Sequence, residues 1–546
     1  MATRHTVFTT KPLGMLLEEA RGDNRLRRVL GPVQLTSLGV GAIIGAGIFV
    51  ATGAAAHNTA GPALMVSYAV AGLTCVFAAL CYAEFASMVP VAGSAYTYAY
   101  ATLGEMMAWI IGWDLTLEYA VGSATVANGW SSYFQSLLPK IGIHLPESIS
   151  TAPIVYDAVK GEFVRTGGFV NLPAVIIVTI VTAILVKGIQ ESASFNALMV
   201  GLKLAAVLFV ILVGAFFINP DNWTAVHPTT GRGGFAPYGW GGLTFFGATI
   251  WGESVGGNPV GMLAGSAIIF FAYIGFDSVS THAEEAKQPN RDVPIGIIAS
   301  LVICTILYIA VVAVLTGMVP YFQIDTGAGV SMAFKSVGLA WAEAIIAIAG
   351  VAGITSVLLV MMLSAPRVFL AMSRDGMLPH SFFGAVHEKF KTPYKSTILV
   401  GVAVAIMTGF LPIDALLQMT NIGTLFAFAI VCAAVLIMRR TNPDAERPFR
   451  APLVPLIPIL GILSCLMLMF SLPAENWLRL ILWLGLGLVI YFVYSRKRSV
   501  MSRHLGHELA SHGISPRGQA VGDPDAPPDS PDRPVDTDAD KRDRDR

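Results

Sequence analysis

Twelve apolar runs, each long enough to cross a lipid bilayer, constrain this 546-residue chain more than any other feature of its sequence. A bilayer core about 30 Å thick needs roughly 20 apolar residues per helix, and backbone groups in hydrocarbon must be hydrogen bonded internally. The sequence therefore predicts an all-α polytopic membrane protein with 12 transmembrane helices. The expected spans cover residues 33–56, 62–89, 103–136, 169–187, 192–218, 263–283, 294–318, 341–372, 395–411, 413–438, 452–472 and 476–495.

The composition supports this class and argues against several others. Hydrophobic residues make up 54% of the chain and charged residues only 13%, whereas soluble domains carry about 25% charged residues. The formal net charge is zero, so nothing indicates a nucleic-acid partner, and the expected surroundings are the lipid bilayer. No nucleotide-binding P-loop, HExxH or GxSxG motif is present, so we expect the protein not to be an enzyme and to have no cofactor or metal site.

The lysines and arginines predict the orientation, because cytoplasmic loops near the membrane retain positive charge. With the N-terminus inside, the cytoplasmic segments carry 20 of these residues and the outer loops carry six. An even number of spans then puts both termini in the cytoplasm of a plasma (inner) membrane protein. The tail after residue 512 is rich in Pro, Asp and Arg, and we expect it to be disordered, either as a solvated extension or as a regulatory segment.

These limits divide the chain into consecutive units. They are a cytoplasmic N-terminus (1–32), spans one to five (33–218), an extracellular loop (219–262), spans six to ten (263–438), spans eleven and twelve (439–495) and a cytoplasmic, largely disordered tail (496–546).

The first span contains a run of glycines that makes a poor helix, with Gly39, Gly41, Gly45 and Gly47 in close succession. A broken helix survives in a membrane only where it is buried in protein or lines a watery cavity, and a binding site supplies such a cavity. Freed amides at the start of the following half-helix suit a carboxylate, while freed carbonyls suit an ammonium group. The alternative is close helix packing through small residues.

The sixth span has a matching interruption, Phe270-Phe-Ala-Tyr-Ile-Gly-Phe-Asp277, which places a glycine and a carboxylate deep in an apolar run. The two interruptions are five spans apart. This separation is expected when two five-helix repeats of opposite topology pack around a site near the middle of the membrane. Asp277 lies near the inner end, where it is either a site residue or a cap or cytoplasmic gate partner.

Few ionisable residues lie within the spans, and each suggests a function because burying charge is costly. Lys203 stands alone in the fifth span and is either a proton carrier or a permanently charged structural cation. Glu118, one helical turn from Asp114, could exchange protons with Lys203, meet a basic substrate or simply join two helices by hydrogen bonds. Thr355 and Ser356 could coordinate sodium, unless Lys203 takes the place of the ion.

Five segments of the chain form a recognisable set, Gly41–Phe49, Glu118–Gly122, Phe271–Asp277, Ala283–Pro294 and Ser373–Pro379. Together they resemble the cationic amino acid transporter branch of the amino acid-polyamine-organocation superfamily, over roughly residues 25 to 495. Two features depart from the expected pattern: His282 stands where a small residue is commoner, and the outer segment between spans five and six is long. Animal members have fourteen spans, whereas this chain supports twelve.

The resemblance implies a LeuT-like fold with a 5+5 inverted repeat, discontinuous helices 1 and 6, and two peripheral helices. It also implies that Lys203 occupies the sodium position of sodium-driven relatives and that Glu118 is the acidic residue of span three. The implied substrate-binding residues are Ile43, Ile44, Gly45, Ala46 and Gly47, for the carboxylate and part of the amino group, and Phe271, Ala272 and Ile274, whose carbonyls receive the ammonium group while Phe271 acts as a lid.

The function expected from the residues and the resemblance is amino acid transport coupled to proton movement, as in bacterial members of this branch. Protonated Lys203 would brace the first span against the fifth and eighth, and its deprotonation would loosen that brace and open the inner gate. The alternatives are proton-independent exchange and an amino acid sensor without turnover. Cationic and small neutral amino acids are both open as substrates, and the sequence does not indicate whether a small single-helix subunit associates.

Overall fold

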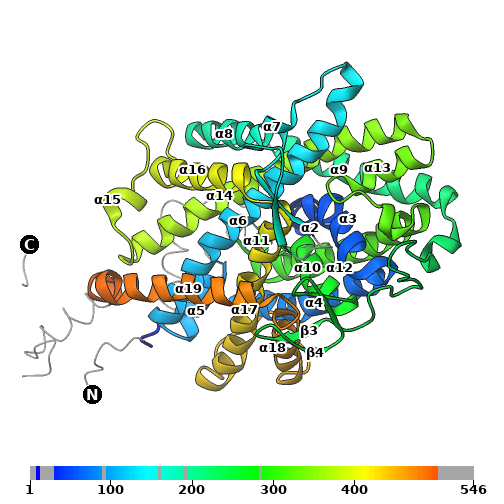
Figure 1. Cartoon of the computed structure of the whole chain (residues 1–546). Coiled ribbons are helices and arrows are strands. Elements are labelled where there is room, and N and C mark those ends of the chain that lie inside the picture. Colours follow the sequence, from blue (N-terminus) through cyan, green and yellow to red (C-terminus); the bar gives the residue numbers. More distant parts are fainter. Residues whose placement is uncertain are drawn as a thin grey trace, which may run out of the picture.

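The computed structural model describes residues 8–12, 30–88, 94–157, 162–188, 193–281 and 286–501, and its helices pack into one bundle (Figure 1). Predictions that concern His282, most of the N-terminal segment and the tail beyond residue 501 lie outside these ranges. The helices are α2 (Pro32–Ile43), α3 (Thr52–Ala55), α4 (Leu64–Met88), α5 (Ser94–Thr102), α6 (Glu105–Leu137), α7 (Glu147–Ser150), α8 (Leu172–Lys187), α9 (Ala193–Gly214), α10 (Met262–Ile269), α11 (Ser278–Thr281), α12 (Pro289–Met318), α13 (Gly329–Ser336), α14 (Ala340–Arg374), α15 (His380–Phe383), α16 (Tyr394–Phe410), α17 (Ile413–Thr441), α18 (Leu456–Met469), α19 (Ala474–Ile490) and α20 (Arg496–Arg498).

Six helical stretches of the described chain are long and apolar enough to cross a membrane. They are 32–88, 198–217, 289–318, 340–374, 415–441 and 474–498, and the first of them contains two of the predicted runs. The shorter apolar helices α8, α10, α16 and α18 coincide with four further runs, and α6 covers the remaining one. A helical, multi-pass membrane protein is thereby confirmed, while the number of twelve crossings stays a prediction.

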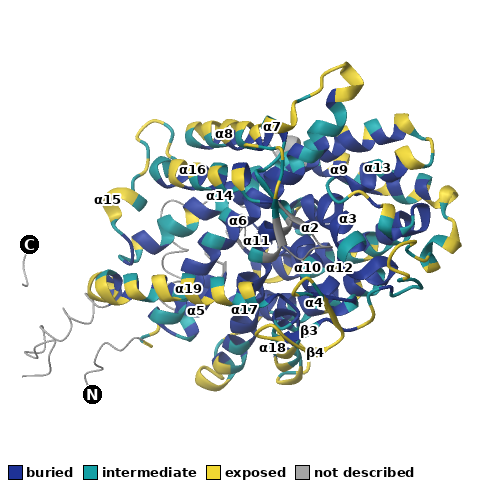
Figure 2. Ribbon diagram, in the orientation of Figure 1, coloured by how far each residue is buried: buried dark blue, intermediate teal, exposed yellow. Residues whose placement is uncertain are grey.

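The side chains on the outside of the bundle are those of a protein surrounded by lipid. Central helices are largely buried, whereas α8, α16 and α19 carry many exposed residues (Figure 2). Large aliphatic residues are exposed on several helices, such as Leu212 of α9, Ile306 of α12 and Leu482 of α19, each more than 60% exposed. Exposed aliphatic rows of this kind are the expected lipid-facing surface of membrane helices.

Small residues let the central helices approach one another closely. A Cβ atom added to Gly350 of α14 would lie 2.7 Å from the Tyr133 ring of α6, and one added to Gly129 of α6 would lie 2.6 Å from Val50. Such contacts allow dispersion attraction between backbones, which drives helix association where no hydrophobic effect operates. They hold α6 between α14 and the first span.

Three short two-stranded antiparallel sheets lie in connecting segments, and the prediction of an all-α chain did not include them. Two of them are hairpins within the long segment between α9 and α10, with turns of positive φ at Phe246-Gly247 and at Gly256-Gly257. The strands are β1 (Ile154–Asp157) with β2 (Glu162–Arg165), β3 (Leu243–Phe245) with β4 (Ala248–Trp251), and β5 (Glu253–Val255) with β6 (Asn258–Val260).

Tryptophans attach α19 to α6. The Trp113 and Trp483 rings stack with centroids 4.5 Å apart, and each indole N–H donates to the backbone carbonyl of the other residue, at 3.0 and 3.1 Å. Trp109 donates to the carbonyl of Gly487 at 2.8 Å. These bonds fix both the register and the rotation of α19, which otherwise presents mostly exposed apolar side chains.

We expect Trp483→Phe to lower the melting temperature of the detergent-solubilised protein by a few degrees, because the ring stacking remains while one hydrogen bond worth about 1 kcal/mol is lost. Trp341→Phe is the matched control, since Trp341 is 57% exposed at the start of α14. Equal melting temperatures for the Trp483→Phe variant and the unsubstituted protein would show that the reciprocal pair contributes nothing to the attachment.

Candidate substrate site

The first broken helix is interrupted at Ile44. Helix α2 ends at Ile43, Ile44 has an extended backbone (φ −71°, ψ 107°), and a helical stretch with wide turns begins at Gly47 and continues to Ala60. The amide of Ile44 still donates to the Val40 carbonyl at 2.9 Å, and that of Phe49 donates to Gly45 at 3.3 Å. The first amides of a helical segment have no carbonyl one turn earlier, so the backbone just after the break offers N–H donors.

The second break lies at Ile274 and Gly275. Helix α10 tightens into a 3₁₀ turn over Phe270–Tyr273, after which Ile274 is extended (φ −57°, ψ 131°) and Gly275 has φ +119°. Side chains rarely adopt that φ, and a Cβ atom there would also lie 2.8 Å from the Ala42 carbonyl oxygen. Glycine is therefore required here both for the turn and for the close approach of the two broken helices.

The two breaks touch each other. A Cβ atom on Gly47 would overlap the backbone of Ala272, so the chains meet there with no space between them. The Tyr308 hydroxyl of α12 lies 2.9 Å from the carbonyl oxygen of Ile43 and 3.2 Å from that of Ala272. Tyr308 thus binds a freed carbonyl from each broken helix. The sequence analysis did not identify it, although a tyrosine within an apolar span needs a hydrogen-bond partner and could have drawn attention.

Some glycines of the first span allow close helix packing, and others lie where the helix is interrupted. Gly39 packs against Ser300 of α12, 2.5 Å from a Cβ atom added there, and Gly41 packs against Val200 of α9. Gly45 and Gly47 lie in the break itself. Close packing and backbone interruption therefore both occur in the same helix, one turn apart.

The predicted substrate-binding residues lie together at these breaks. All eight are buried, with the Ile43, Phe271 and Ile274 side chains each 3% exposed, so this conformation is closed to solvent at this place. Their side chains are apolar or absent, so the polar groups that they can offer a ligand are backbone amides and carbonyls. Such groups can hold an α-amino acid by its carboxylate and ammonium.

Lys203 connects three helices next to the first break. Its ammonium group donates to the Gly41 carbonyl of α2 at 2.7 Å, and its aliphatic stem lies 3.1 Å from a Cβ atom added to Gly353 of α14. The residue is 1% exposed. The contacts are those expected of a brace between the first, fifth and eighth spans, whereas its protonation cycle stays a prediction.

The two hydroxyl residues of α14 have partners of their own. Thr355 accepts a hydrogen bond from the Trp130 indole at 2.9 Å and donates to the Val351 carbonyl at 2.7 Å. Ser356 donates to the Gly353 carbonyl at 3.1 Å. Among the described residues, no group of three His, Cys, Asp or Glu side chains could hold a metal ion.

Glu118 lies in a group of buried carboxyl residues with Asp277 and Asp114. The Thr424 hydroxyl is its hydrogen-bonding neighbour, and its second carboxyl oxygen has no partner among the described residues. Tyr119 donates to the Asp277 carboxylate at 3.4 Å. Proton exchange between Glu118 and Lys203 stays a prediction.

A further polar cluster, which the sequence analysis missed, joins the N-terminal segment to the end of α14. The Lys11 ammonium lies 3.2 Å from one Asp375 carboxylate oxygen, and the Tyr96 hydroxyl of α5 donates to the other at 2.6 Å. The Lys11 and Asp375 side chains are only 7% and 15% exposed. The pair therefore fastens three chain segments that are remote in sequence.

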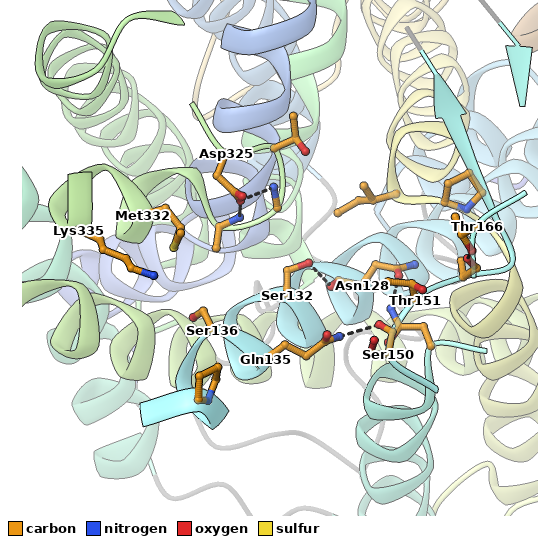
Figure 3. Close-up of a pocket in the computed structure, with 18 of the residues that line it drawn as sticks. Asn128, Ser132, Gln135, Ser136, Ser150, Thr151, Thr166, Asp325, Met332 and Lys335 are labelled. Atoms are coloured by element: carbon orange, nitrogen blue, oxygen red, sulfur yellow. Dashed lines mark hydrogen bonds between the residues drawn. The ribbon is translucent and has the colours of Figure 1, made fainter. Parts of the chain in front are cut away.

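A polar pocket of about 750 Å³ lies apart from the two breaks, and none of the predicted site residues lines it (Figure 3). Asn128, Ser132 and Gln135 of α6 form one wall, while Asp325 and Lys335 come from the connection before α13 and from α13 itself. Gln135 is held by the Ser150 carbonyl at 2.8 Å. The pocket is a hollow lined mainly by polar residues at one end of the helices.

Comparison with known proteins places this architecture in a family. The family model described as "Amino acid permease" matches residues 30–493. The chain is 42% identical over 498 residues to the "Methylthioribose transporter" of Bacillus subtilis (strain 168), covering 91% of this chain and 100% of that protein. It is 46% identical over 499 residues to the "Branched-chain amino acid permease BcaP" of the same organism, covering 91% and 99%. The "Cationic amino acid transporter 4, vacuolar" of Arabidopsis thaliana is 36% identical over 423 residues, covering 78% and 65%.

We expect Gly47→Ala to weaken substrate binding at least tenfold, because the added methyl group must push the first broken helix away from Ala272 and displace the freed backbone groups. The KM for uptake of a radiolabelled amino acid into proteoliposomes checks this. Gly485→Ala is the control, since nothing lies within 4 Å of the Cβ atom added there. An unchanged KM for Gly47→Ala would place the binding site elsewhere.

Proposed function

This chain belongs to the amino acid permease family, and from that premise we propose that it carries an amino acid together with a proton by alternating access. It is a membrane transporter and not an enzyme, in agreement with its family and its relatives. The observation that carries the proposal is the contact of two interrupted helices at Gly47 and Ala272, where backbone donors and acceptors converge in a buried place.

The proposed fold is LeuT-like, with twelve membrane crossings. The first repeat would comprise residues 33–218 and the second residues 263–438, with α18 and α19 as peripheral helices. The breaks support this arrangement, because they occupy corresponding positions of the first helix of each half. The excess of lysine and arginine in alternate connections supports cytoplasmic termini in the plasma membrane.

The substrate would lie across the two breaks. Its carboxylate would accept hydrogen bonds from the amides that follow Ile44, at the positive end of the second half-helix. Its ammonium group would meet the carbonyls of Ile43 and Ala272, which Tyr308 holds in this conformation. Phe271 would close over it.

The side chains around this place favour a neutral aliphatic substrate. Ile43, Ile44, Phe271 and Ile274 offer apolar contacts only, and one relative is named a branched-chain amino acid permease. Cationic amino acids are the second candidate, which the name of another relative favours, as does the Glu118 carboxyl oxygen that has no partner among the described residues. In that case the basic side chain would need to reach α6.

In a competition panel of twenty amino acids against radiolabelled leucine in proteoliposomes, we expect valine, isoleucine and alanine to inhibit uptake strongly. Arginine and lysine should inhibit weakly, because a desolvated cation has no acceptor among the apolar residues at the breaks. Strong competition by arginine and lysine instead would assign the cationic class, and Glu118→Gln should then abolish that competition.

Proton coupling is proposed to act through Lys203. When protonated, it donates a charge-assisted hydrogen bond to Gly41 and holds α2 against α9 and α14. Loss of the proton leaves a weaker neutral bond, so the inner half of the first span can move. The Lys11–Asp375 pair, at the end of α14, would be part of the inner closure that must then open.

We expect Lys203→Gln to abolish accumulation driven by a pH gradient while sparing exchange of internal for external amino acid, since glutamine keeps a hydrogen-bond donor but cannot release a proton. Uptake with and without an inwardly directed proton gradient measures this. Lys335→Gln, an exposed lysine of α13, is the matched control. Uptake by Lys203→Gln that depends on pH as in the unsubstituted protein would refute the role of Lys203, and gradient-independent uptake by the unsubstituted protein would favour plain exchange.

A further inference from the structure

The segment between α9 and α10 contains an unusual apolar hairpin. Residues 233–252 include no charged side chain, although they belong to a connection and not to a span. Within this stretch β3 and β4 pair in antiparallel fashion, with Phe245 opposite Ala248. Phe245, Phe246, Ile250 and Trp251 are 51%, 55%, 60% and 54% exposed, so four large apolar side chains project together from one small element.

The turn of this hairpin presents an aromatic residue where one is not expected. Phe246 and Gly247 both have positive φ, at +46° and +89°, which is the conformation of a two-residue type I′ turn. Asn or Asp normally precedes the glycine in such turns, because other side chains adopt positive φ at a cost of roughly 1 kcal/mol. A phenylalanine at this position is unfavourable for the turn, which points to a use for its side chain outside the hairpin.

The hairpin is attached to the connection between two apolar helices. Thr244 donates its amide to the Phe470 carbonyl at 2.7 Å, directly after α18 (Figure 1). The Phe245 and Phe470 rings lie 5.6 Å apart, as do those of Phe246 and Trp477. Rings from the hairpin and from the start of α19 thus form one continuous aromatic group.

This attachment sets the depth of the hairpin in the membrane. Helix α18 has 14 residues and spans about 21 Å, which is less than the roughly 30 Å of a bilayer core. A helix this short cannot bring both of its ends to the interfaces without further chain, and the aromatic rings at Phe470 are of the kind that an interface favours, so we place this end at the edge of the hydrocarbon region. The outward side chains of α18 and α19, such as Leu463 and Leu482, are exposed and continue the same surface.

We propose that the β3–β4 hairpin is a membrane anchor, which inserts Phe246, Ile250 and Trp251 into the interface of one lipid leaflet. Aromatic side chains are favoured at that depth, and the charge-free sequence avoids the cost of burying ions there. Arg232 and Glu253, the charged residues that flank the stretch, pair with each other at 2.9 Å. A polar protein partner would find few hydrogen-bonding side chains on this hairpin, whereas lipid requires none.

The segment before β3 is bonded to the start of α10, and the residue before α10 is bonded in turn to the end of the first span. Gly261, just before α10, donates its amide to the Thr59 carbonyl at the end of the first span, at 2.8 Å. Leu263 of α10 donates to the Gly241 carbonyl, two residues before β3, at 3.1 Å. Interfacial insertion therefore fixes the position of this end of α10 relative to the bilayer.

Spin labels attached to Phe246→Cys and Ile250→Cys in proteoliposomes test the anchor by collision with lipid-soluble oxygen and with a water-soluble nickel chelate. We expect oxygen to relax both labels several-fold more effectively than nickel. Thr229→Cys, in an exposed turn of the same segment, should show the reverse. The five native cysteines are buried, and spin labelling of the unsubstituted protein measures the background that they contribute.

Nickel collisions at positions 246 and 250 equal to those at 229 would place the hairpin in water and overturn the proposal. Protection from both reagents would show that protein covers it and would overturn the proposal equally. Because a substitution could disturb the turn, quenching by brominated lipid provides a second measurement. Subtracting the emission spectrum of Trp251→Phe from that of the unsubstituted protein isolates the emission of Trp251. We expect brominated lipid to quench this emission strongly, and an absence of quenching would contradict insertion.

Discussion

This structure depends on one constraint, which is that backbone amides and carbonyls inside a membrane must be hydrogen bonded. An interruption in a buried helix frees amides and carbonyls that water cannot reach, at a cost of a few kcal/mol for each group left unpaired. The chain limits this cost by bringing its two interruptions together. Gly275 approaches the Ala42 carbonyl, Gly47 meets Ala272, and Tyr308 serves carbonyls from both helices.

Charged groups in the interior also require hydrogen-bonding partners. Glu84, which is 2% exposed, receives two hydrogen bonds from Arg439, at 2.9 and 2.7 Å, and one from the Ala451 amide at 2.8 Å, so its charge is compensated at the end of α4. Lys203 instead donates to a backbone carbonyl beside a break.

The elements predicted from sequence are those that depend on local chemistry. Runs of apolar residues predict helices in lipid, and glycines beside Ile44 and Ile274 predict the breaks, because helix propensity and backbone satisfaction are properties of a short segment. Tyr308 and the Lys11–Asp375 pair were missed because their partners are 36 or more residues away, and no periodicity reports such contacts. The hairpins were missed because their strands have only three or four residues, too few for an alternating pattern.

The position of Tyr308 changes how ligand entry at the breaks must be described. Its hydroxyl already lies on the two carbonyls that we propose as acceptors for the ammonium group, and each carbonyl oxygen still has a second lone pair to offer. In the proposed binding mode, a resident donor of this kind orients both acceptors before the ligand arrives, so that less reorganisation accompanies capture and release.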